Sequence, residues 1–157
     1  MLKVTVGQVE FFVNAHDAGA IAIHDKDSIP NRKVRYWLGR ALEKCISENK
    51  GNNGIVAHRR SMLKEFAEFD EKGNPVTVDR EVNGNKIKVF KFFNDKAEAD
   101  WNKAVEEHRS QVIELAMDPI EHTEDDLDMP MSNLQIIFPF LKEINPSESP
   151  KIIPKPE

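Results

Sequence analysis

The sequence predicts a protein of the α+β class, in which a long bent or broken helix and a second helix pack with a small antiparallel sheet. Residues 30–70 and 94–112 carry apolar side chains at helical spacing. Between them, residues 76–92 contain Asn83-Gly84, the preferred central pair of a type I′ hairpin turn. Residues 145–157 are rich in proline, which predicts an extended tail after a single domain at residues 1–144.

The N-terminal region allows two interpretations. The apolar residues between Val4 and Val13 suit a short strand that runs into a helix, or one amphipathic helix. Residues 18–23 are interpreted as a connector, because their glycine marks a bend. Ser28 or Asp27 is predicted to cap the first long helix, with Pro30 near its first turn, where the missing N–H costs little.

The first long helix contains an internal conflict. Its apolar face runs from Val34 to Cys45 and resumes in the same phase at Val56. Between them, Gly51–Gly54 would normally end a helix, because each glycine costs up to about 1 kcal/mol relative to alanine. Two interpretations therefore remain, a helix hairpin that turns at Gly51–Gly54 or a single bent helix.

The hairpin is the most secure local prediction. Both central positions of a type I′ turn need a positive φ, which asparagine and glycine adopt most readily. Opposite charges across such a hairpin stabilise its register by about 0.2–1 kcal/mol per pair. Folding about Asn83-Gly84 predicts the pairs Val78 with Val89, Val82 with Asn85, Asp79 with Lys88, and Glu81 with Lys86.

The second helix is predicted to begin at a cap formed by Asn94 or Asp95 and to bury Trp101. Residues 112–117 after it either continue the helix or form a third strand beside the hairpin. Pro119 ends the segment, because a residue before proline disfavours the helical conformation. The third strand is attractive, since a lone two-stranded hairpin is marginal in water.

Composition excludes several classes of protein. The chain has 157 residues, 39% of them apolar and 31% charged, as expected for one soluble domain. No apolar stretch approaches the roughly 20 residues needed to cross a bilayer. Glu10 interrupts what would have to be an apolar signal core, and the only cysteine, Cys45, cannot form an internal disulfide. These observations favour the cytoplasm, with Cys45 as a small core residue.

Charge is distributed unevenly along the chain. The net charge is −5, but residues 1–60 hold ten Lys or Arg against six Asp or Glu, and residues 61–157 hold twelve against twenty-one. Such a dipolar distribution steers charged partners and favours head-to-tail association of copies.

Two C-terminal segments are candidate surfaces for a protein partner. The first is an acidic patch, which would attract a basic partner because it has no basic residue. It lacks the glycine and alternating spacing of a calcium loop, so we expect no metal there. The second is an apolar segment that either caps the core or is exposed as a partner-binding anchor. The acidic patch comprises Asp118, Glu121, Glu124, Asp125, Asp126 and Asp128, and the apolar segment contains Ile137, Phe138 and Phe140.

The N-terminal half suggests nucleic-acid binding as an alternative. Its candidate contacts are Arg32, Lys33, Arg35, Arg59 and Arg60. Nucleic-acid binders usually combine such a stripe with a basic domain, whereas this chain has a pI near 5.6. A small metal-dependent enzyme around His24 or His122 is the third alternative. We expect no enzyme, catalytic residue or cofactor, because no phosphate-binding glycine loop, serine elbow or convincing Cys–His pairing is present.

Several stretches of the chain together have a familiar layout. They are Ile29-Pro30, Val34-Arg35-Tyr36, His58-Arg59-Arg60, FAEFDEKGNP at 66–75, residues 100–103 and VIELAMDPI at 112–120. Over roughly residues 30–141 this layout resembles a group of small uncharacterised proteins encoded by tailed phages and prophages. In that group a long helix ends in an Asp-Glu-x-Gly turn and leads through a variable hairpin to a short helix and an acidic strand. The Gly51–Gly54 insertion departs from the group's uninterrupted helix.

The resemblance implies a phage origin and gives no activity. With the charge pattern, it leads us to expect a non-catalytic phage-encoded protein that binds another protein, either in virion assembly or as an inhibitor of a host or defence factor. Its location would then be the cytoplasm of an infected or lysogenic bacterial host, or the virion. The alternatives are a nucleic-acid-associated accessory protein and a small metal-dependent enzyme.

Overall fold

The computed structural model describes residues 1–145, so the proline-rich tail lies outside the described residues except for Asn145. The fold is α+β, as the sequence predicts. Its elements are β1 (Leu2–Thr5), α1 (Val6–Asp17), α2 (Arg32–Lys50), α3 (Ile55–Leu63), β2 (Thr77–Val82), β3 (Asn85–Phe90), α4 (Asp95–Arg109), β4 (Val112–Leu115), β5 (Ile120–His122), the 3₁₀ turn η1 (Glu124–Asp126), α5 (Met131–Ile137), the 3₁₀ turn η2 (Phe138–Phe140) and β6 (Leu141–Glu143).

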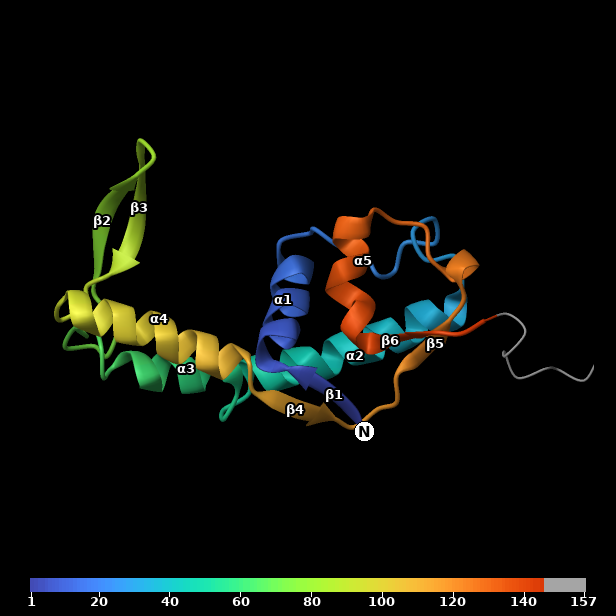
Figure 1. Cartoon of the computed structure of the whole chain (residues 1–157), viewed down its shortest axis with the longest axis horizontal. Helices are drawn as coiled ribbons and strands as arrows, with labels where there is room; N and C mark the ends of the chain where they lie inside the picture. The colour runs from blue at the N-terminus through green and yellow to red at the C-terminus, as the bar shows by residue number, and fades with distance from the viewer. Residues whose placement is uncertain (146–157) are drawn as a thin grey trace, which may run out of the picture.

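The molecule is elongated and consists of a body and an arm (Figure 1). The body is formed by residues 1–50 and 112–145, and the arm by residues 51–111, which the chain inserts between α2 and β4. Each part has its own hydrophobic cluster. The body buries α1 against α2 and α5, whereas the arm packs Leu63, Ala67 and Trp101 together. The domain boundary at residue 144 stays a prediction.

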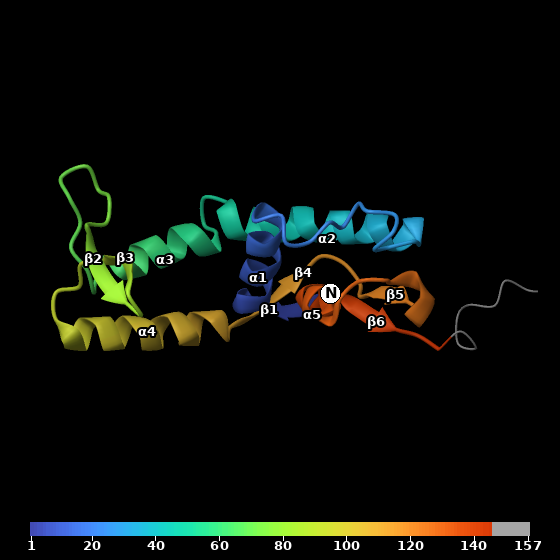
Figure 2. The ribbon, with the colours of Figure 1, turned by 90° about the horizontal axis from the view of Figure 1, so that it is seen from above.

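One long bent helix runs through both parts (Figure 2). α2 ends at Lys50, and α3 begins at Ile55 and continues in a similar direction, so the helix hairpin interpretation is wrong. The interruption is short because the Gly54 N–H donates to the Gly51 carbonyl at 2.9 Å. A Cβ at Gly54 would lie only 2.7 Å from the Glu48 carbonyl oxygen, so this close approach requires glycine.

The cap of α2 differs from the prediction. Asn31 caps the helix, and its Oδ1 accepts from backbone N–H groups two and three residues on, at 2.9 and 3.3 Å. Ser28 makes a different hydrogen bond, because its hydroxyl donates to the carboxylate of Asp25 at 2.9 Å. Neither Ser28 nor Asp27 is the cap, and Pro30 lies immediately before Asn31, near the first turn as predicted.

The hairpin has the predicted register. Asn83 and Gly84 adopt φ of 52° and 80°, as a type I′ turn requires. Cross-strand partners are Val78 with Val89, Val82 with Asn85, Asp79 with Lys88, and Glu81 with Lys86. The hairpin rises from the far end of the arm, on the same side as α1 and α5 (Figure 1).

The third-strand prediction is correct about the strand and wrong about its partner. Residues 112–115 form β4, which pairs antiparallel with β1 and joins Leu115 to Leu2 and Ile113 to Val4. The pairing is favourable because β1 buries Leu2 and Val4 on one face. β1 runs directly into α1, which confirms the strand-then-helix interpretation of the N-terminal region. None of the helices in residues 1–145 has the length and apolar content of a bilayer-spanning segment.

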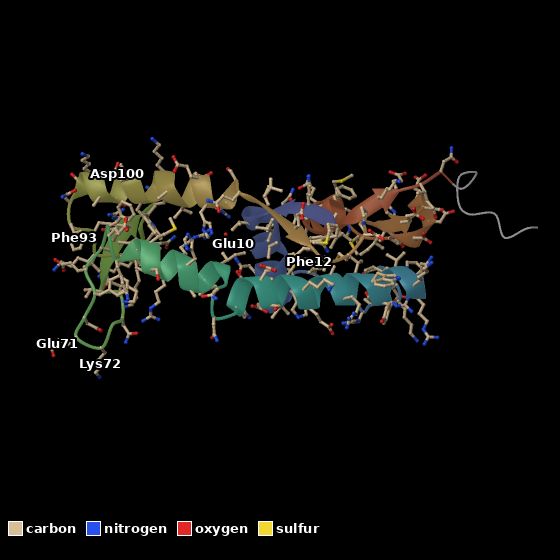
Figure 3. All side chains as sticks on the ribbon, turned by 90° about the horizontal axis from the view of Figure 1, so that it is seen from below. Glu10, Phe12, Glu71, Lys72, Phe93 and Asp100 are labelled. Carbon is tan, nitrogen blue, oxygen red and sulfur yellow. The ribbon has the colours of Figure 1, made fainter. Side chains whose placement is uncertain are left out.

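A largely buried ion pair joins the body to the arm. Glu10 of α1 lies near the middle of the molecule, where the body meets the arm (Figure 3). Its carboxylate accepts two hydrogen bonds from the Arg59 guanidinium of α3, at 2.6 and 2.7 Å. Arg59 Nη2 also lies 3.1 Å from Nδ1 of the buried His108 on α4. Since a guanidinium only donates, His108 is neutral here and accepts through Nδ1.

We expect the free energy of unfolding to fall as the pH is lowered through about 6.5. Burial, together with the nearby Arg59 and His58, holds the pKa of His108 below its usual value. Between the two pKa values the unfolded chain binds a proton that the folded chain does not, so acid favours unfolding. Below the folded pKa this contribution levels off. Urea unfolding at several pH values measures it, and the non-titrating variant His108→Gln should lose less stability over the same range. Equal slopes in both proteins would contradict this assignment.

Candidate functional site

The members of the acidic patch differ in their surroundings. Asp126 is hydrogen-bonded within the protein. Its carboxylate accepts from the Asn31 side chain at 3.0 Å and from the Thr123 N–H at 2.7 Å. Burial acts to raise the pKa of Asp126, but these hydrogen bonds outweigh it, and the pKa lies below its usual value. The other members are exposed in different places: Glu124 and Asp125 line a hollow beside β6, Asp128 lies in the loop before α5, and Asp118 and Glu121 border α2.

The apolar segment belongs mainly to the core. Ile137 and Phe140 have no exposed surface, and the Phe140 ring lies 4.9 Å from that of Phe12. The apolar segment was predicted either to cap the core or to be exposed for a partner. Ile137 and Phe140 belong to the core. Phe138, with 43% of its surface exposed, is the member of this group that a partner can reach.

Three of the five basic candidates are bonded within the protein. Arg35 donates to two backbone carbonyls just before α2, at 2.6 and 3.0 Å. Arg59 binds the carboxylate of α1, and Arg60 donates to the turn that precedes β2. Arg32 and Lys33, both exposed on α2, have no ion-pair partner within residues 1–145.

A groove runs along α2 next to these free cations. We call it the α2 groove; it has a volume of about 500 Å³ and lies between α2 and residues 116–121, which comprise the connection after β4 and the first two residues of β5. Its α2 wall presents Lys33, Trp37, Arg40 and Lys44. These positions are separated by four, three and four residues, so they form one stripe along the helix. Cations and an indole ring therefore share one wall.

The opposite wall of the α2 groove is acidic. It is formed by Asp118 and Glu121, two members of the acidic patch, and includes Pro119. No ion pair joins these carboxylates to the α2 cations within residues 1–145. The groove is consequently open between two walls of opposite charge, with the buried side chains of Val34 and Ile120 also lining it.

Trp37 is the most accessible anchor in the groove. It has 41% of its surface exposed and meets the exposed Tyr36 edge to face, with 5.2 Å between ring centroids. Trp, Tyr and Arg are the residue types that most often dominate binding energy at protein interfaces. The stripe was readable from the helical spacing of the sequence, but the acidic wall was not, because it comes from a distant segment.

A second cavity, of about 310 Å³, is lined mainly by residues of the arm and has fewer groups that could bind a ligand. It is lined by apolar residues such as Leu63, Phe90 and Trp101. Its charged residues are Glu10 and Arg59, which are bonded to each other, and Arg60, which donates to Asn74 Oδ1 at 3.1 Å.

In the α2 groove, Arg40 pairs with Glu43 and Asp118 with the N-terminal ammonium group, but Lys33, Lys44 and Glu121 have no ion-pair partner within residues 1–145. The α2 groove therefore offers more charged groups to a ligand than the second cavity does.

The candidate metal and thiol sites show little reactive character. Residues 1–145 contain no group of three or more His, Cys, Asp or Glu side chains placed to hold a metal ion. His122 is buried, and its Nδ1 lies 3.1 Å from the Thr123 carbonyl oxygen. Burial, with a smaller effect from Glu48, raises the pKa of Cys45 to about 12, so its thiol stays protonated at neutral pH.

No protein-family model, curated protein or solved structure matches this chain. The resemblance to phage proteins therefore stays an expectation from layout, and a functional interpretation depends on the site alone.

Proposed function

We propose that this is a non-catalytic protein, of the phage-encoded class that its layout resembles, and that it acts by binding another protein. The binding would serve virion assembly or the inhibition of a host or defence protein. Such a protein would work in the cytoplasm of a bacterial host or in the virion. The α2 groove is the surface to which we assign this binding.

The observation that carries the proposal is the exposed Trp37 between Lys33 and Lys44, two cations without an ion-pair partner in the described part of the chain. An exposed indole keeps a large apolar surface in contact with water, which is unfavourable, and it contributes strongly to binding once a partner covers it. Lysine side chains without partners can form charge-assisted hydrogen bonds with that partner. The combination is typical of an interface.

The groove supports protein better than nucleic acid as the partner. A strand of nucleic acid would have to bring its phosphates close to Asp118 and Glu121 on the opposite wall. In addition, Arg35, Arg59 and Arg60 are bonded within the protein and are not free to meet phosphates.

Photo-crosslinking from the groove tests the proposal. With a photoreactive residue in place of Trp37, illumination in an extract of bacterial host cells should give discrete adducts that protease removes and nuclease does not. A matched control carries the same residue in place of Phe93, which is also an exposed aromatic and lies at the far end of the arm (Figure 3). Adducts sensitive only to nuclease, or identical adducts from both positions, would contradict the proposal.

A further inference from the structure

The length of the cationic stripe limits what the α2 groove can hold. Lys33 and Lys44 are eleven positions apart on α2. At 1.5 Å per residue they are separated by about 16 Å along the helix axis. A segment that meets both lysines and covers Trp37 must therefore extend over about this distance.

The groove can hold an extended segment. Such a segment covers about 16 Å with about five residues. Alternate side chains point to opposite sides, so one face can enter the groove, which has a volume of about 500 Å³, while the other face stays outside. A helix covers the same length but keeps most of its backbone N–H groups bonded within itself.

The charges of the two walls define the chemistry of that segment. The α2 wall, with Lys33 and Lys44, needs acceptors such as carboxylates. The opposite wall, with Asp118 and Glu121, accepts hydrogen bonds and needs donors. An extended polypeptide supplies both, because its side chains can carry carboxylates and its backbone carries unpaired N–H groups. A nucleic-acid backbone has phosphates but no such row of N–H donors.

We infer that the α2 groove binds an extended, acidic segment of the partner protein, with an apolar side chain against Trp37 and carboxylates directed to Lys33 and Lys44. The carboxylates of Asp118 and Glu121 then accept from the backbone N–H groups of that segment. This inference rests on the proposed function and specifies its partner.

The intrinsic fluorescence of the full-length protein offers a direct test. Trp37 is exposed and Trp101 is buried in the arm, so a ligand in the groove changes mainly the Trp37 signal. The probe is an acetylated, amidated peptide of sequence Glu-Thr-Leu-Thr-Glu, in which both carboxylates and the leucine share one face when extended. We expect saturable binding that weakens with salt. The charge-reversed peptide Lys-Thr-Leu-Thr-Lys should not bind.

Charge-reversal variants locate the binding. Lys44→Glu should weaken binding of the acidic peptide by about tenfold, because it replaces a charge-assisted hydrogen bond with repulsion. Lys103→Glu, which makes the same change in net charge on an exposed position of α4, should leave the affinity unchanged. Equal effects of the two variants, equal binding of the two peptides, or no binding at millimolar peptide would overturn the inference. Binding of a short oligothymidylate in place of the acidic peptide would also overturn it.

The two proposals fail in different ways. If photo-crosslinking from position 37 gives protein adducts while the acidic peptide does not bind, the extended acidic segment is wrong and protein binding stands. If position 37 gives no protein adduct, the proposed function fails, whatever the short peptide does.

Discussion

Replacing Phe140 with alanine is expected to lower the free energy of unfolding by about 3–5 kcal/mol. The Phe140 side chain has no exposed surface, and its ring packs 4.9 Å from the buried ring of Phe12, tilted by 47°. The substitution removes these contacts and leaves a cavity between α1 and the C-terminal segment. Since small domains unfold with about 5–15 kcal/mol in total, this loss is a large part of the stability. Urea unfolding measures it directly.

The matched control is Phe138→Ala, two residues away. Phe138 keeps 43% of its surface exposed, so we expect its truncation to cost less than about 1 kcal/mol. Phe140→Ala and Phe138→Ala together distinguish the two interpretations of the apolar segment. If both variants unfold like the wild type, the C-terminal segment does not cap the core of the body, and the role assigned to Phe140 is wrong.

Local sequence patterns predicted the hairpin and both main helices well. The Asn83-Gly84 turn defines the register because both residues tolerate a positive φ, and every cross-strand pair then follows from counting. Asn94 caps α4 as expected, with its side chain accepting from the Ala97 N–H at 2.8 Å. Features of this kind depend on residues close in sequence, which is why they can be read without a structure.

Long-range pairings were harder to predict. β4 was expected beside the hairpin, but it pairs with β1, which lies more than a hundred residues earlier in the chain. Short strands carry no local signal that selects one partner over another. The cap of α2 was misplaced for a similar reason. Asn31, Ser28 and Asp27 are all capable of capping, and Asn31 also binds Asp126 from a distant turn.

The candidate site was predictable on one side only. Helical spacing places Lys33, Trp37 and Lys44 on one stripe, and this can be read from the sequence. The acidic residues were predicted as one patch, but nothing in the sequence places Asp118 and Glu121 opposite the stripe of α2. A groove between oppositely charged walls thus depends on tertiary structure that composition and charge runs do not contain.

Replacing Glu10 with alanine is expected to destabilise the protein by about 2–4 kcal/mol. The Glu10 and Arg59 side chains are only 13% and 20% exposed, and two short hydrogen bonds join them. Without Glu10, the Arg59 cation stays largely buried without a counter-charge, and its Nε has no hydrogen-bond partner among residues 1–145. His108 can accept only one hydrogen bond from it. The loss should appear in urea unfolding and as faster hydrogen exchange in α3 and α4.

Two further variants show whether the loss of stability in Glu10→Ala comes from a buried Arg59 charge without a counter-charge. Asp17→Ala breaks the other ion pair of α1, with Lys50, whose side chains are 47% and 53% exposed, and should cost less than about 1 kcal/mol. Adding Arg59→Met to Glu10→Ala removes the buried cation, so the double variant should be more stable than Glu10→Ala alone. If the double variant is instead less stable, the penalty comes from lost packing, and the arm is held to the body by contacts other than this pair.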